Sequence, residues 1–214
     1  MKKQLAAFGL VTGTFLAAGS VHAAQTAEIK VIGKILPDAC QLVIGGGGTY
    51  DFGSIGSDKL SQDAVTPLEG KAQTLTVTCN AAAKVALKAT DNRSGSVVGG
   101  KGDGYEFGLG GTDAGSKPGF YSLRMSNAVS EGNTLDVLSD ASGGGSWVTG
   151  SSLFHADSGE RKSFAGSGGT LPDAFKTISA DLTVTPTINK LSELDLSKGS
   201  VALDGSATIE LVYL

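Results

Sequence analysis

The chain has 214 residues, a formal net charge of −4 and only 18% charged residues, and it contains 32 glycines. This acidic balance argues against a nucleic-acid-binding protein, which would carry a basic face, and against a polybasic surface for anionic lipid. Abundant Gly, Ser, Thr and Val with few charges is typical of all-β chains, and the length allows one large domain.

The first 23 residues have the three parts of a secretory signal. Lys2 and Lys3 precede a short apolar stretch, and small residues at Val21 and Ala23 form a cleavage site. A membrane-spanning helix needs about 20 predominantly apolar residues, and this stretch is shorter and interrupted by Gly and Thr, so an uncleaved anchor is the weaker interpretation. We therefore expect residues 1–23 to be removed on export, with no membrane span afterwards. Subtracting the two lysines from 17 basic residues leaves 15 against 21 acidic ones.

Residues 24–36 form a predicted extended segment, here called the arm. Alternate residues share one face of a strand, because successive side chains of a β-strand point to opposite sides. The apolar face of the arm consists of Ala27, Ile29, Val31, Gly33 and Ile35. Pro37 ends the segment.

Residues 37–214 form the predicted domain, a β-sandwich with long Gly-rich loops in its middle. Alternation and turn residues predict strands at 50–55, 75–79, 85–89, 176–188, 199–203 and 206–214, with a turn at the four glycines from Gly45. Between residues 91 and 172 short apolar islands stand among Gly, Ser and Asp clusters, which predicts hairpins with long loops. A calcium-binding β-roll is disfavoured because no nonapeptide period recurs.

The two cysteines, Cys40 and Cys79, are expected to form one disulfide, because the signal directs the chain to an oxidising compartment. The bridge would join the first strand of the domain to the strand beginning near Thr74. The chain-entropy relation gives about 4 kcal/mol for closing a loop of this length. No CxxC motif or neighbouring histidine supports a metal or redox site.

Catalytic and cofactor motifs are absent from the sequence. His155 is the one histidine after the signal, and no GxSxG elbow marks Ser151 or Ser152 as a nucleophile. We expect His155 to be an exposed loop residue. The sequence therefore predicts a protein without enzymatic activity, metal or cofactor.

Four segments, in this order, resemble the pilins of the chaperone-usher pathway. They are residues 33–40 (GKILPDAC), residues 50–55 (YDFGSI), Cys79, and residues 205–214 (GSATIELVYL) with their penultimate tyrosine. The chain is most similar to a poorly characterised group of proteobacterial fimbrial-like proteins that share the LDGSATIELVYL-type ending and the Gly-rich centre.

The resemblance implies an immunoglobulin-like sandwich that lacks its final strand. A groove in the sandwich would be lined by the C-terminal strand through Ala207, Ile209, Leu211, Tyr213 and Leu214. It would be filled first by a strand of a periplasmic chaperone and then by the arm of a neighbouring subunit. The implied protein is a structural subunit of an adhesive surface fimbria (pilus), delivered through an outer-membrane usher, with its periplasmic stage transient.

Three departures from the pilin pattern keep an alternative open. Only nine residues, 24–32, precede Gly33; Val201 stands where pilins often have glycine; and the middle is unusually rich in glycine. The alternative is a self-contained secreted or periplasmic β-sandwich binding module that does not polymerise, in which the arm is an ordinary first strand. A secreted hydrolase is a distant third.

Overall fold

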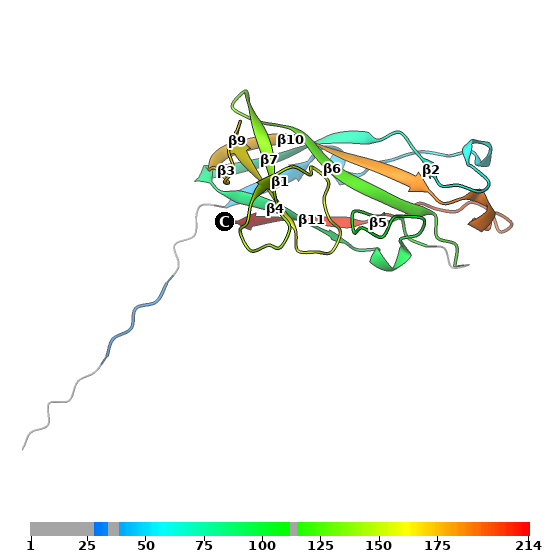
Figure 1. The fold of residues 1–214 in the computed structure, drawn as a ribbon, viewed down its shortest axis with the longest axis horizontal. Coiled ribbons are helices and arrows are strands. Elements are labelled where there is room, and N and C mark those ends of the chain that lie inside the picture. The colour runs from blue at the N-terminus through cyan, green and yellow to red at the C-terminus, as the bar shows by residue number, and fades with distance from the viewer. Residues whose placement is uncertain (1–27, 34–38, 112–114) are drawn as a thin grey trace, which may run out of the picture. The chain divides into compact units, whose positions relative to one another are not determined.

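The computed structural model describes residues 28–33, 39–111 and 115–214 (Figure 1). The chain divides into two units, Met1–Ile35 and Leu36–Leu214. The predicted signal, Ala27 and Ile35 lie outside the described residues. No helix in the described part of the chain is long and apolar enough to cross a membrane.

The second unit is an all-β sandwich of two antiparallel layers, as predicted (Figure 1). The first layer has the order β1 (Cys40–Ile44), β3 (Lys71–Ala83), β10 (Phe175–Ile188) and β6 (Gly119–Ser130), with β2 (Thr66–Pro67) beside β10 and β5 (Phe107–Gly108) beside β6. The second layer has the order β7 (Asn133–Asp140), β9 (Arg161–Gly166), β4 (Val85–Asp91) and β11 (Ala207–Tyr213), with β8 (Val148–Thr149) beside β7.

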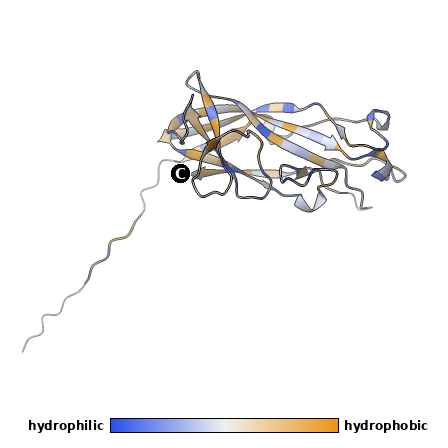
Figure 2. Cartoon of the chain, viewed as in Figure 1, coloured by the Kyte–Doolittle hydropathy of each residue, from blue (hydrophilic) through white to orange (hydrophobic). Residues whose placement is uncertain are grey.

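The core lies between the layers and follows from the alternation of the strands. Each long strand sends one set of apolar side chains inward and a Thr- and Ser-rich set outward, so hydrophobic and hydrophilic residues interleave along the ribbons (Figure 2). Phe107, Phe154 and Phe164 fill the interior and are essentially inaccessible to solvent. Full burial of one such side chain contributes about 1.5–3 kcal/mol.

One side of the sandwich is closed by hydrogen bonds. The β6–β7 hairpin pairs Val129 with Thr134 at the corner where the chain changes layer. Residues 151–154 then lie along β6: the Met125 N–H donates to the Ser152 carbonyl and the Phe154 N–H donates to the Leu123 carbonyl, each at 2.9 Å. The exposed edge of β6 is thereby covered.

Two predicted strands are wrong. Residues 50–55 and 199–203 form no strand and have no ladder partner among the described residues, and each contains a glycine with positive φ, Gly53 at 63° and Gly199 at 114°. Tyr50, Phe52 and Leu203 are nevertheless half-buried against the core. Alternation of apolar and polar residues indicates that one face of a segment is buried, and it does not show that the segment pairs with a strand. Here the buried face lies beside an edge to which no strand of the described chain is paired.

The predicted glycine turn folds as a 3-10 turn, η1 (Gly45–Gly48). Gly46 and Gly47 have φ of 58° and 65°, a left-handed conformation that residues with a Cβ rarely adopt. The turn ends β1 and leads into the segment from Tyr50. Three further 3-10 turns are η2 (Ser57–Lys59), η3 (Ser94–Ser96) and η4 (Leu191–Glu193), and no α-helix occurs in the described ranges.

Candidate strand-binding groove

A groove runs between the two free edges of the sandwich. β1 is paired only with β3, and β11 only with β4, within the part of the chain that the structure describes. A cavity of about 390 Å³ lies between these edges. Its lining comes from the β1 side (Ile44, Tyr50, Phe52), from the β11 side (Leu203, Ala207, Ile209) and from strands β6 and β10 of the first layer (Leu123, Leu182, Val184).

The groove continues past the end of β1. A second cavity of about 560 Å³ shares Tyr50, Phe52 and Leu203 with the first. Its outer part is lined by the two segments whose alternation had predicted strands. These segments therefore prolong the walls of the groove.

The backbone of β1 presents hydrogen-bonding groups to the groove. The Cα atoms of Cys40 and Cys79 are 4.0 Å apart, which identifies this position as a non-hydrogen-bonded pair of the antiparallel ladder. Such pairs recur at every second residue, so Leu42 and Ile44 are in the same class. The N–H and C=O groups of these three β1 residues point away from β3 and toward the groove.

The backbone of β11 does the same from the other side. The Leu214 N–H donates to the Lys84 carbonyl at 3.1 Å, and the Asn92 N–H donates to the Ser206 carbonyl at 3.0 Å. Even-numbered residues of this strand therefore pair with β4, and the odd-numbered residues from Ala207 to Tyr213 turn their polar groups outward.

The residues that offer free backbone groups also supply apolar side chains. On β1 and β11 these side chains are half-buried and pack on the core: Cys40, Leu42, Ile44, Ala207, Ile209 and Leu211. Asp204 is the one charged residue among those lining the first cavity. An extended chain with one apolar face would find both hydrogen-bond partners and apolar contacts here.

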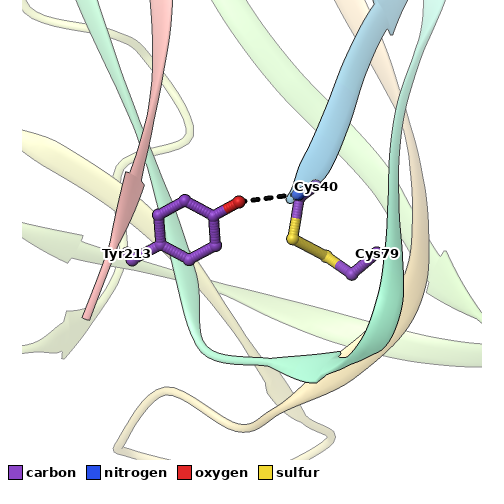
Figure 3. The surroundings of a disulfide bond; sticks show 3 residues. All are labelled: Cys40, Cys79 and Tyr213. Atoms are coloured by element: carbon purple, nitrogen blue, oxygen red, sulfur yellow. Dashed lines mark hydrogen bonds between the residues drawn. A yellow bond between two sulfur atoms is a disulfide. The ribbon is translucent and has the colours of Figure 1, made fainter. Parts of the chain in front are cut away.

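The disulfide end of the groove is bridged by a single hydrogen bond. The expected Cys40–Cys79 disulfide is confirmed, and the Cys40 N–H donates to the Tyr213 hydroxyl oxygen at 2.6 Å (Figure 3). A tyrosine reaches about 6.5 Å from Cα to Oη by standard bond lengths, so the Tyr213 Cα lies at most about 9 Å from that nitrogen. This upper limit is below two strand spacings, about 9.6 Å, and at this end the tyrosine side chain itself spans the distance between the two edges.

Burial keeps two tyrosine hydroxyls of the groove, those of Tyr50 and Tyr121, protonated. The Tyr50 hydroxyl donates to the Leu182 carbonyl at 2.9 Å, and burial raises the pKa of Tyr50 to about 12. Burial, followed by the charge of Asp91, also raises the pKa of Tyr121. The groove floor therefore keeps its protonation state across the ordinary pH range.

The predicted site residues are placed as follows. Ala207 and Ile209 line the first cavity, Leu211 packs on the core, and Tyr213 crosses to Cys40. Leu214 is exposed.

The described arm residues belong to the other unit. Residues 28–33 form no strand, and Ile29 and Val31 are about 90% exposed (89% and 91%). Gly33 is exposed as well.

Sequence reasoning missed the wall formed by β1. The segment CQLVI at Cys40–Ile44 does alternate, but it is short and carries the cysteine, which drew attention to the disulfide instead. The roles of Tyr50 and Phe52 as groove lining were also missed. Tyr50 and Phe52 are two residues apart, as on one face of a strand, and apolar Ile55 follows them. This pattern could have indicated that the segment buries one face.

His155 is half-buried, and the expectation of an exposed residue is wrong. Its ring packs edge-on against Tyr105 with centroids 5.2 Å apart, and its backbone N–H donates to Glu160 at 3.1 Å. The described residues contain no group of three side chains suited to holding a metal ion.

Comparison with known proteins finds similarity over nearly the whole chain. The chain is 28% identical over 235 residues to "Uncharacterized protein YhcF" of Escherichia coli (strain K12), covering 96% of this chain and 98% of that protein. It is 26% identical over 252 residues to "Protein GltF" of the same organism, covering 100% and 99%. The profile of a family described as "Protein of unknown function (DUF1120)" matches residues 29–108. That region includes part of the arm, both cysteines and the β1 wall of the groove.

Proposed function

We propose that the chain is a structural subunit of a surface fimbria, exported through its N-terminal signal and assembled by strand donation. The arm of a neighbouring subunit occupies the groove between β1 and β11. The observation that carries this proposal is the cavity between two unpaired strand edges, with apolar side chains and outward backbone groups on both walls.

The arm has the length and pattern that the groove requires. Its alternating part, residues 27–35, spans about 30 Å as a strand. The seven residues of β11 span about 23 Å, and the walls continue beyond them past Leu203. Burial of three or four arm side chains contributes about 5–10 kcal/mol before ordering costs. Strand hydrogen bonds to the two edges then hold the occupant in an extended conformation.

The same gap requires protection before assembly. Unpaired strand edges with apolar side chains aggregate unless another chain covers them. A periplasmic chaperone that lends a strand, followed by transfer at an outer-membrane usher, meets this requirement. In this proposal the protein has no catalytic role.

A peptide of residues 24–35 tests the proposal on the full chain. The chain's own arm is first disabled by Ile29→Asp and Val31→Asp, because a buried unpaired charge opposes insertion. Adding the peptide should raise the unfolding temperature in proportion to the logarithm of its concentration. A peptide carrying Lys30→Asp, on the opposite face, should stabilise equally, whereas one carrying Ile29→Asp should not.

A negative result with the peptides would favour the alternative function. If all three peptides leave the unfolding temperature unchanged, strand donation is wrong. The protein is then a self-contained secreted or periplasmic β-sandwich module that does not polymerise.

A further inference from the structure

The pattern of the arm leaves its alignment in the groove ambiguous. A shift by one residue would turn the apolar face outward and bring only Ile32 inward with Glu28 and Lys30, so burial excludes it. A shift by two residues, however, keeps an apolar face inward, because Ala27, Ile29, Val31, Gly33 and Ile35 repeat with period two. Something other than alternation must distinguish alignments that differ by two residues.

The hydrogen bond between the Cys40 N–H and the Tyr213 hydroxyl lies at the end of the groove, where it can distinguish these alignments. Cys40 is the first residue of β1, and its N–H points into the groove with Leu42 and Ile44. The Tyr213 hydroxyl already accepts this N–H at 2.6 Å. It is the one hydrogen bond that joins β1 to β11 among the described residues.

We propose that Tyr213 sets the register of the inserted strand by occupying the Cys40 N–H, so that pairing along β1 begins at Leu42. This inference rests on the proposed function. An inserted strand can gain two hydrogen bonds at Leu42 and two at Ile44, whereas at Cys40 only the carbonyl is open, because Tyr213 already accepts the N–H. Ordering a further residue costs conformational entropy for at most one new hydrogen bond, so insertion stops before the tyrosine.

The hydroxyl also links the two edges of the groove at this end. A binding site already held in its bound geometry loses less entropy on binding. Tyr213 is therefore a positioning residue: it acts on the occupant through the edge of β1.

Amide hydrogen exchange followed by NMR tests the register directly. The full chain carries Ile29→Asp and Val31→Asp, with or without Tyr213→Phe, and the probe is the peptide of residues 24–35. Without Tyr213→Phe, the Cys40 amide should be protected before peptide addition and keep its chemical shift afterwards, while Leu42 and Ile44 become protected. With Tyr213→Phe, the Cys40 amide of the free protein should exchange about tenfold faster and become protected when peptide is added.

Each other outcome contradicts either the register proposal alone or strand donation as well. If Leu42 and Ile44 become protected but Cys40 in the Tyr213→Phe protein exchanges equally fast with and without peptide, the register proposal is wrong and strand donation stands. A peptide-induced shift of Cys40 with Tyr213 intact also overturns it. If no amide responds to peptide in either protein, both proposals fail. Tyr105→Phe, outside the groove, is the matched control and should leave all three amides unchanged.

Discussion

A substitution at Lys162 tests how the sandwich is closed on the side away from the groove, where residues 151–154 cover the edge of β6. Its side chain is fully buried on the inner face of the second layer. The Nζ atom donates to Glu160 at 2.8 Å, to the Ser139 hydroxyl at 3.0 Å and to the Ser151 carbonyl at 2.9 Å. Burial lowers the pKa of Lys162, and the hydrogen bond and charge of Glu160 oppose that shift. The ammonium thus ties the segment that covers β6 to the core.

Replacing Lys162 by Met should be strongly destabilising. The change leaves the Glu160 carboxylate buried without a counter-charge and the Ser151 carbonyl without its donor. Breaking a buried ion pair from one side costs about 3–5 kcal/mol, whereas replacing both charges by neutral groups is often tolerated. Lys162→Met should therefore lower the free energy of unfolding by about 3–5 kcal/mol, and adding Glu160→Gln should recover about half of that loss or more.

Urea unfolding at pH 7, followed by circular dichroism, measures both quantities. Exchange of the Met125 and Phe154 amides should rise in the single variant, because these amides bond the covering segment to β6. The reasoning is refuted if Lys162→Met costs less than about 1 kcal/mol, or if the double variant is less stable than the single one.

Three further predictions concern other parts of the sandwich. Replacing Cys40 and Cys79 by Ser should cost about 4 kcal/mol, measured by urea unfolding; an equal loss in wild type on adding reductant is the check. Burial raises the pKa of Asp140, but the hydrogen bond from Arg161 and other donors outweigh it and hold that pKa below its usual value. The unfolded state therefore binds the proton first, so stability is full above about pH 4 and falls as pH drops through the lowered value; urea midpoints between pH 5 and 2 should show this fall, and Asp140→Asn should flatten it. Gly119 has φ of 138° and its Cβ would collide with a β10 carbonyl oxygen, so Gly119→Ala should lower stability by more than about 2 kcal/mol, and an unchanged thermal midpoint would contradict this.

Alternation of apolar and polar residues in the sequence predicts the strands that have one face in the core and the other in solvent. β3, β4, β10 and β11 lie within or close to the predicted ranges, because each places apolar residues in the core and Thr or Ser outside. The disulfide was predictable from the export signal, which indicates an oxidising compartment, and from the presence of two cysteines.

Strands that bury charge were not predictable in this way. β7 ends in Asp140 and β9 begins with Arg161 and Lys162, so their sequences look like polar loop. Burial of Asp140 depends on Arg161 in another strand, and burial of Lys162 depends on Ser139 and the Ser151 carbonyl besides the nearby Glu160. These distant partners are encoded by no local pattern.

Two of the residues expected to line a groove, Ala207 and Ile209, line the first cavity. The C-terminal strand gave one wall, but the second wall requires knowing that β1 pairs with β3 by the disulfide register. The segments around Tyr50 and Leu203 alternate like strands, and only the tertiary structure shows that they border a gap.

The two walls of the groove come from distant parts of the chain, and this orders its folding. Cys40 and Tyr213 are 173 positions apart, so their contact closes a very long loop. Contacts of high sequence separation form late, because the entropy of closure must be offset by structure already in place. β11 finds its strand hydrogen bonds on β4, and β4 pairs in turn with β9. Both walls of the groove are therefore present together only in the folded chain, and a molecule that contacts both walls would bind the folded chain and not a partly folded one.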